Sequence, residues 1–128
     1  MEYCDINQGI DPTCVYGGYD VYDYSGILEY VVIEHAGLIV TENDEINPLT
    51  LAGVGSGTRI NNIAISYSND DGIEVFGGSV NLEWVYLFNI RDDALDISMG
   101  YSGRIEHALA LSNRRAEMTR YMNGENGY

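Results

Sequence analysis

The stretch Asn69-Asp70-Asp71-Gly72-Ile73-Glu74-Val75 recurs further along the chain as Arg91-Asp92-Asp93-Ala94-Leu95-Asp96-Ile97. Acidic residues coincide at three positions of the two stretches, and β-branched or leucine residues coincide at two. A period in the low twenties, carried by short alternating segments, is typical of a solenoid whose repeats stack on one another. The repeat therefore predicts that the matching carboxylates lie in columns.

A second repeated phrase supports the same period. Residues 59–67 read Arg-Ile-Asn-Asn-Ile-Ala-Ile-Ser-Tyr, with Ile63 and Ile65 expected inside and Ala64 and Ser66 outside. The same pattern recurs as Leu82, Val85 and Leu87, then in 105–111, and earlier in 28–33. The early copy lies farther away than one period, which we attribute to a glycine-rich insertion over 38–58 that includes a short strand at Leu49-Thr50-Leu51. Coils stacked about 4.8 Å apart form an all-β parallel β-helix, which is the predicted fold class, in a short or truncated form.

The length of 128 residues allows one domain, in three parts. Residues 1–24 are turn-rich and predict a loop or cap, 25–112 form the β-helix, and 113–128 form an arginine-rich tail, a cap or the start of a further coil. Open coil ends expose unpaired strand edges, so the chain is either truncated or able to self-associate through these ends. Cys4 and Cys14 predict a disulfide of the kind found in exported proteins, with two free thiols as the alternative.

Charge limits the partners. The chain has 20 Asp and Glu residues against 6 Lys and Arg residues, a net charge of −14. Such a surface repels nucleic acid and anionic membranes and attracts divalent or cationic partners. The alternative is that acidity serves solubility alone. We find no signal peptide and no apolar run long enough to span a bilayer.

Several phrases, in the same order, resemble the large secreted or lipid-anchored surface proteins of Bacteroidetes and other marine bacteria. They are Ser25 to Gly37, Glu45 to Thr58, Asn69 to Asp71 with Glu74, Phe76 to Asn81, and Asp92 through Asp96 to Tyr101. The resemblance covers roughly residues 25–112. It implies a right-handed parallel β-helix that is extracellular or at the cell surface, and it implies no particular activity.

The acid columns suggest a metal. Asp70 over Asp92 and Asp71 over Asp93, about 5 Å apart, repel by a few kcal/mol at an intermediate dielectric constant. Calcium prefers oxygen ligands and would offset this repulsion, so Ca²⁺ is the candidate cofactor. The candidate ligands are Asp70, Asp71, Glu74, Asp92, Asp93 and Asp96. The alternative is that the Asp side chains accept hydrogen bonds from nearby turn amides.

The paired aspartates also permit an enzyme. The phrase Asp-Asp-x-Ile-x-Ile resembles the motif of polygalacturonase-type glycosidases, which are inverting enzymes on β-helices. The resemblance makes Asp71, Asp92 and Asp93 the catalytic candidates. The chain lacks the Gly-His-Gly and Arg-x-Lys phrases of that family, so the enzyme ranks second.

A binding module ranks first. Tyr30, Asn62, Trp84 and His107 share one register and are expected to form a column on the surface of the coil. With Tyr86, these side chains would stack on sugar rings of a polysaccharide or cell-surface glycan and bond their hydroxyls. A third reading is structural, as a segment of an adhesin or filament.

Overall fold

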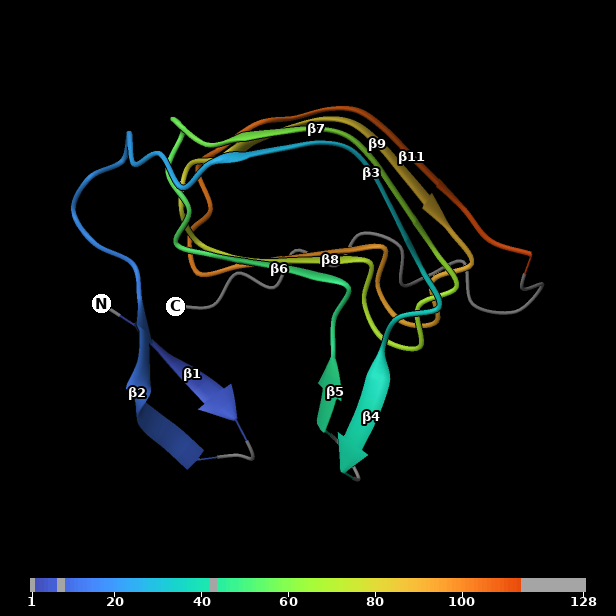
Figure 1. Ribbon diagram of the computed structural model, residues 1–128, viewed down its shortest axis with the longest axis horizontal. Helices are drawn as coiled ribbons and strands as arrows, with labels where there is room; N and C mark the ends of the chain where they lie inside the picture. The colour runs from blue at the N-terminus through green and yellow to red at the C-terminus, as the bar shows by residue number, and fades with distance from the viewer. Residues whose placement is uncertain (1, 7–8, 42–43, 114–128) are drawn as a thin grey trace.

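The chain forms a parallel β-helix. A computed structural model describes residues 2–6, 9–41 and 44–113, in which all regular elements are strands (Figure 1). The long strands are β3 (Ile27–Glu34), β7 (Arg59–Ser66), β9 (Asn81–Phe88) and β11 (Ile105–Leu111), which pair in parallel in the order β11-β9-β7-β3. The short strands are β6 (Leu49–Ala52), β8 (Ile73–Phe76) and β10 (Leu95–Ser98), which pair in parallel in the order β10-β8-β6.

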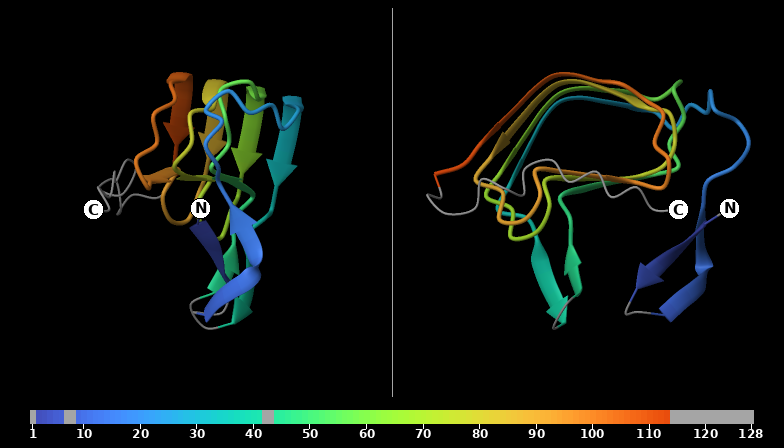
Figure 2. Two further views of the ribbon diagram at one scale, coloured as in Figure 1. Left: turned by 90° about the vertical axis from the view of Figure 1, so that its left-hand side faces the viewer. Right: turned by 180° about the vertical axis from the view of Figure 1, so that it is seen from behind.

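The predicted register is confirmed. Ile60 pairs with Leu28 on one side and with Leu82 on the other, and Ile105 then pairs with Leu82. In the short sheet, Ile73 pairs with Leu95, its counterpart in the next repeat. The coils lie side by side in successive layers, which is clearest when the molecule is turned (Figure 2).

The core is a set of aliphatic columns between the two sheets. Side chains alternate between the two faces of a strand, and in the long strands this alternation is interrupted once, so that Ile60, Ile63 and Ile65 of β7 point inward. Ile63, Ile65 and Leu87 are each at most 1 % exposed, and Ile73 and Val75 of β8 face them fully buried. Burying one such side chain stabilises the fold by about 1.5–3 kcal/mol, so these columns hold the coils together.

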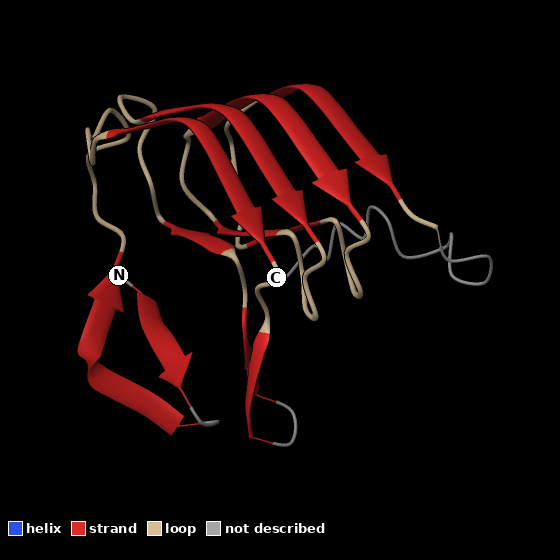
Figure 3. Ribbon diagram, turned by 45° about the vertical axis from the view of Figure 1, so that its right-hand side comes forward, coloured by secondary structure: helices blue, strands red, loops and turns tan. Residues whose placement is uncertain are grey.

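Each long strand bends near its middle (Figure 3). The residue at the bend is Tyr30, Asn62, Trp84 or His107, with φ between 55° and 57°, and it is left out of the strand pairing. We call these four residues the kink column. The predicted alignment of the four is confirmed. A left-handed backbone costs about 1–2 kcal/mol for most residues and is tolerated best by Gly, Asn and Asp.

Two antiparallel hairpins project from the coils (Figure 1). One pairs β4 (Leu38–Thr41) with β5 (Asp44–Ile46), between β3 and β6. It explains most of the displacement of the early copy, because the connection from Glu34 to Leu49 is more than twice as long as the one from Ser66 to Ile73. The glycine-rich run after β6 is only slightly longer than its counterpart between Phe76 and Asn81. The insertion is therefore mainly a hairpin, contrary to our attribution to the glycines.

The other hairpin is at the N-terminus, where a loop or cap was expected. It pairs β1 (Glu2–Ile6) with β2 (Gly9–Tyr16). Tyr3 pairs with Val15, so the backbones of Cys4 and Cys14, the next residues inward, lie on neighbouring strands. The disulfide stays a prediction. The predicted tail lies outside the described residues beyond Asn113.

The link between β2 and β3 packs over the glycine-rich corner of the coils. The carbonyl oxygen of Val21 accepts hydrogen bonds from the Ser56 amide at 2.9 Å and from the Ser79 hydroxyl at 2.6 Å. Gly55 lies under this link, because a Cβ atom there would sit 2.5 Å from the backbone nitrogen of Asp23. The corner therefore needs glycine for close approach of two backbones.

Candidate ligand-binding surface and acidic corner

The kink column presents large aromatic side chains to solvent. Tyr30 is 80 % exposed and Trp84 is 53 % exposed. Trp84 stacks on His107, with ring centroids 4.0 Å apart and an interplanar angle of 13°. Since His107 belongs to the next coil, it covers one face of the indole, and the opposite face is directed toward the coil of Asn62.

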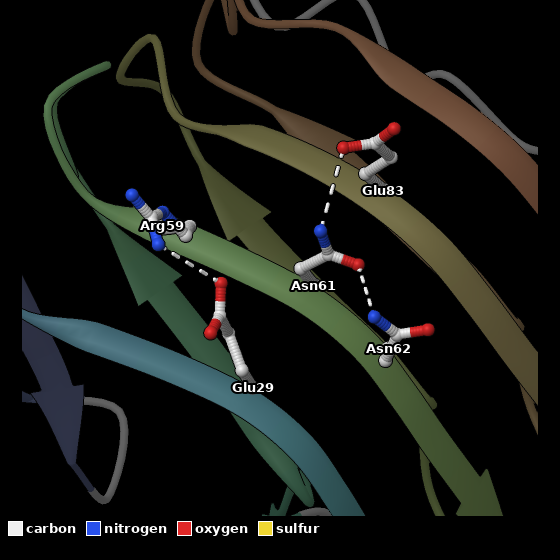
Figure 4. A network of polar contacts seen from close by, with 5 residues as sticks. All are labelled: Glu29, Arg59, Asn61, Asn62 and Glu83. Carbon is white, nitrogen blue, oxygen red and sulfur yellow. Dashed lines mark hydrogen bonds and ion pairs between the residues drawn. The ribbon is translucent and has the colours of Figure 1, made fainter.

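Asn62 carries the shortest side chain of the kink column, on the side of the indole that faces away from His107. Its Nδ2 donates a hydrogen bond at 2.6 Å to Oδ1 of Asn61, and Nδ2 of Asn61 donates at 3.4 Å to Oε2 of Glu83 (Figure 4). The short Asn62 side chain is thus drawn toward its neighbour in the strand. Tyr30 and Trp84 lie on the two coils that flank the coil of Asn62, and these two coils are about 10 Å apart.

A column of three glutamates and one asparagine runs beside the kink column, one position earlier in each strand. It consists of Glu29, Asn61, Glu83 and Glu106, which are paired in register, and we call it the glutamate column. Arg59 Nη1 lies 3.3 Å from Glu29 Oε1 (Figure 4), and Arg104 Nε lies 3.2 Å from Glu106 Oε1. Sequence reasoning missed this column, although the register that aligned the kink residues aligns their predecessors as well.

Tyr86 lies apart from the kink column. It is two residues after Trp84, on the outer face of the second half of β9, where it pairs with Ala64 and Leu109. Its ring stacks on Phe88 with centroids 6.3 Å apart. Tyr86 therefore extends the aromatic surface along the strand and is not part of the column that was predicted for the other four residues.

The acidic corner gathers five of the six predicted metal ligands. Carboxylate oxygens of Asp70, Asp71 and Asp92 lie within 4.8 Å of one another, as do those of Asp71, Glu74 and Asp96. Asp93, the sixth, belongs to neither group, and its backbone N–H donates a hydrogen bond at 2.9 Å to Asp71 Oδ1. The corner thus combines the two expected features, a concentration of carboxylates and an Asp that caps a turn amide.

Two carboxyl groups of the corner resist ionisation. Burial raises the pKa of Asp71 from 3.8 to about 7, the Asp93 amide opposes this rise, and the negative charges of neighbouring aspartates add to it. Burial also raises the pKa of Glu74, against the hydrogen bonds that its Oε2 accepts from Asn47 Nδ2 at 2.9 Å and Thr50 Oγ1 at 3.2 Å. Sequence reasoning missed Asn47. Thr50 was detectable, because it occupies the position of Glu74 one coil earlier.

Two of the catalytic candidates, Asp71 and Asp92, lie closer together than the carboxyl pair of an inverting glycosidase. Oxygens of Asp71 and Asp92 lie within 4.8 Å, whereas inverting enzymes keep their two carboxyl groups about 6.5–9.5 Å apart to admit a water. A pocket of about 530 Å³ lies at the base of the β4–β5 hairpin, lined by His35, Ala36, Gly37, Ile46, Asn47, Pro48 and Asn69. None of Asp71, Asp92 and Asp93 lines it, so the geometry does not favour the enzyme reading.

The stacked parallel coils, the aliphatic columns between two sheets and the bent long strands define a short parallel β-helix. The chain belongs to the pectate-lyase-like β-helix domain family, whose model matches residues 6–127. This bears out the expected resemblance at the level of a β-helix family. Comparisons with curated proteins and with solved structures gave no match. The described part of the chain holds no helix long and apolar enough to cross a membrane.

Proposed function

We propose that the chain is a carbohydrate-binding β-helix module of an extracellular or cell-surface protein, and that the glycan lies across the kink column. The observation that carries the proposal is the exposure of Tyr30 and Trp84 at backbone positions with φ of 57° and 56°. Membership of a pectate-lyase-like β-helix family supports a carbohydrate-associated role at the coarse level.

The backbone strain favours a functional reason for these aromatic residues. Asn occupies the same position at Asn62 and tolerates the left-handed conformation well, whereas Tyr and Trp are costly there. Exposed rings gain little from burial that would offset this cost. Strained residues tend to cluster at binding sites, where the surrounding structure holds them in place.

The placement of Tyr30 and Trp84 on either side of Asn62 suits a sugar ring. The C–H face of a pyranose would pack on the face of the Trp84 indole opposite His107, and the Tyr30 ring would contact the other side. Contacts at about 3.5–4 Å on each face require roughly 7–8 Å between the two aromatic rings. The two coils are about 10 Å apart, and rotation of the exposed Tyr30 side chain toward Trp84 would bring the two rings to the required separation. The Asn62 amide would bond a ring hydroxyl.

Calorimetric titration with a panel of soluble oligosaccharides tests this proposal. Trp84→Asn is the variant of choice, because Asn already fills the equivalent position one coil earlier and preserves the bend. We expect it to weaken binding by about fivefold or more, since stacking of one aromatic ring on a ligand contributes about 1 kcal/mol or more. Tyr19→Ala, an exposed aromatic outside the sheets, is the control and should bind normally. Equal binding by Trp84→Asn and the native chain would overturn the proposal.

We also propose that the acidic corner binds a calcium ion that braces the coils. The specific observation is that two carboxylate triplets share Asp71, so one cation could neutralise charges from two adjacent coils. Asp71, Glu74 and Asp96 would hold the ion, because hard oxygen donors at short range match the preference of Ca²⁺. A cation there would offset the burial of the charged carboxylate, which is the main cause of the raised pKa of Asp71, and the repulsion from neighbouring aspartates, which adds to it.

Thermal melting with increasing CaCl₂ tests the brace. A ligand that binds only the folded chain raises its melting temperature in proportion to the logarithm of its concentration above the dissociation constant. We expect that rise in the native chain and its loss in Glu74→Gln, with Glu34→Gln, which removes one charge from the long sheet, as the control. A melting temperature that is insensitive to calcium, or a rise that Glu74→Gln leaves unchanged, would rule out the site.

A further inference from the structure

We propose that the glycan bound at the kink column carries protonated amino groups, as in a deacetylated amino sugar polymer, rather than uronates. This inference rests on the proposed carbohydrate-binding function and names its ligand class. It comes from the juxtaposition of two columns, one aromatic and one carboxylate, on the same outer face of the long sheet.

The two columns are adjacent along the whole sheet. A glutamate directly precedes the kink residue in three of the four long strands. These pairs are Glu29 and Tyr30 in β3, Glu83 and Trp84 in β9, and Glu106 and His107 in β11. A carboxylate beside an aromatic face is the combination that recognises an ammonium group, because the ring quadrupole and the carboxylate attract the same cation. Any ligand stacked on Trp84 therefore lies next to negative charge.

Glu83 is the carboxylate best placed for a ligand. Glu29 and Glu106 form ion pairs with Arg59 and Arg104, which partly neutralise them. In residues 2–6, 9–41 and 44–113, no arginine forms an ion pair with Glu83, whose Oε2 accepts a hydrogen bond from the Asn61 amide at 3.4 Å. That bond orients the carboxylate without cancelling its charge. Glu83 also directly precedes Trp84, whose side chain is 53 % exposed.

The net charge of the whole chain also favours a cationic ligand. A net charge of −14 repels a polyuronate and concentrates cations at the surface. The arginines that could bind a uronate at this face, Arg59 and Arg104, are already paired with glutamates. A basic peptide shares the positive charge of an amino sugar but lacks a flat C–H face for the indole, so the glycan fits the aromatic column better.

Calorimetry with three oligomers of equal length tests the inference: a glucosamine tetramer, an N-acetylglucosamine tetramer and a galacturonate tetramer. At about pH 5.5 amines of this type are protonated and ordinary Glu carboxylates are ionised. We expect the glucosamine tetramer to bind at least about tenfold more tightly than the acetylated one, as a charge-assisted contact predicts, and the galacturonate tetramer to bind weakest.

Glu83→Gln isolates the charge, because Gln keeps the size and the oxygen that Asn61 bonds. It should reduce the preference for glucosamine to about twofold or less while leaving the acetylated tetramer bound. Glu34→Gln, which removes one charge at the end of β3, should keep the preference.

Each outcome decides a different claim. If no oligomer binds, the proposed carbohydrate function fails along with this inference. If the acetylated tetramer binds as tightly as glucosamine, and Trp84→Asn abolishes both, only the cationic preference is overturned. If tetralysine binds as tightly as the glucosamine tetramer and through Trp84, the partner is a basic peptide and the glycan assignment is wrong.

Discussion

The indole of Trp84 lies flat against the imidazole of His107, with ring centroids 4.0 Å apart, although both residues have a left-handed backbone with φ of 56°. Two adjacent coils with the same bend direct their side chains alike, so rings at equivalent positions meet face to face. Stacking of this kind contributes about 0.5–1.5 kcal/mol beyond area burial and offsets part of the backbone strain. Stability and strain at the kink column are therefore coupled between neighbouring coils.

Tyr30 lacks this compensation among the described residues, because it is 80 % exposed at the far end of the column from His107. We expect Tyr30→Asn to raise the free energy of unfolding by about 1 kcal/mol, because Asn tolerates the left-handed backbone. The same variant should weaken glycan binding. Urea denaturation and calorimetry measure the two effects. Val32→Asn, at an exposed position of the same strand without positive φ, should not be stabilising.

Stability should depend on pH through Asp71. Its pKa rises from 3.8 to about 7 on folding, so between these values the folded chain binds more protons than the unfolded chain. The free energy of unfolding therefore falls as pH rises through this window. Asp71→Asn should flatten the profile and stabilise the chain above pH 7 by about 1 kcal/mol, after allowance for solvent screening of a half-buried group.

Urea denaturation at about pH 5 and about pH 8 measures this difference. Glu34→Gln changes the net charge equally but lies on the long sheet, hydrogen bonded to Ser66, and should leave the Asp71 contribution in place. Saturating calcium should also flatten the native profile if the corner binds the ion, since a cation would take the place of the proton. A native profile that rises over this pH range would contradict the assignment.

The glycine-rich corner should not accept a side chain at Gly55. A methyl group there would approach the Asp23 backbone nitrogen to 2.5 Å, so Gly55→Ala must displace the link between β2 and β3. We expect a loss of about 1–3 kcal/mol in the free energy of unfolding. Gly18→Ala is the matched control, because a Cβ atom at Gly18 meets no atom within 4 Å. Equal stability of the two variants would show that the link does not pack on the corner.

The aliphatic columns should dominate stability. Ile65 is fully buried between coils, and Ile65→Ala should cost about 2–5 kcal/mol through lost burial and an unfilled cavity. Ile27→Ala, at a position of β3 that is 54 % exposed, should cost less than about 1 kcal/mol. Thermal and urea unfolding of both variants checks the contrast. Similar losses in the two variants would mean that the buried columns do not dominate the free energy of unfolding.

The repeat made most of this fold predictable. Acidic and aliphatic residues that match at a fixed spacing must stack on their counterparts in the next coil. The pairing of Ile73 with Leu95 and of Ile63 with Val85 followed directly from this spacing. The same logic predicted the kink column from Asn62 and Trp84. Periodicity carries this information because each coil must present the same face to the next.

Features outside the repeat were harder to predict from the sequence. The β4–β5 hairpin has no counterpart between β7 and β8 or between β9 and β10, so its residues could be counted but not assigned to an element. The contact of Asn47 with Glu74 depends on how that hairpin returns to the coil. The left-handed backbone at Trp84 gave no sequence signal either, because aromatic residues rarely occupy it.

The hairpin between β3 and β6 has a broader consequence. The chain leaves the coil after His35, makes an excursion that is missing from the connections between β7 and β8 and between β9 and β10, and rejoins with Leu49 still paired to Ile73. The register of the coils thus depends on the residues that face the interior, and it is preserved when the connection at this corner is longer. Foreign peptides grafted between Gly37 and Asn47 would be displayed on a rigid scaffold, which makes this molecule a natural starting point for engineered presentation of loops.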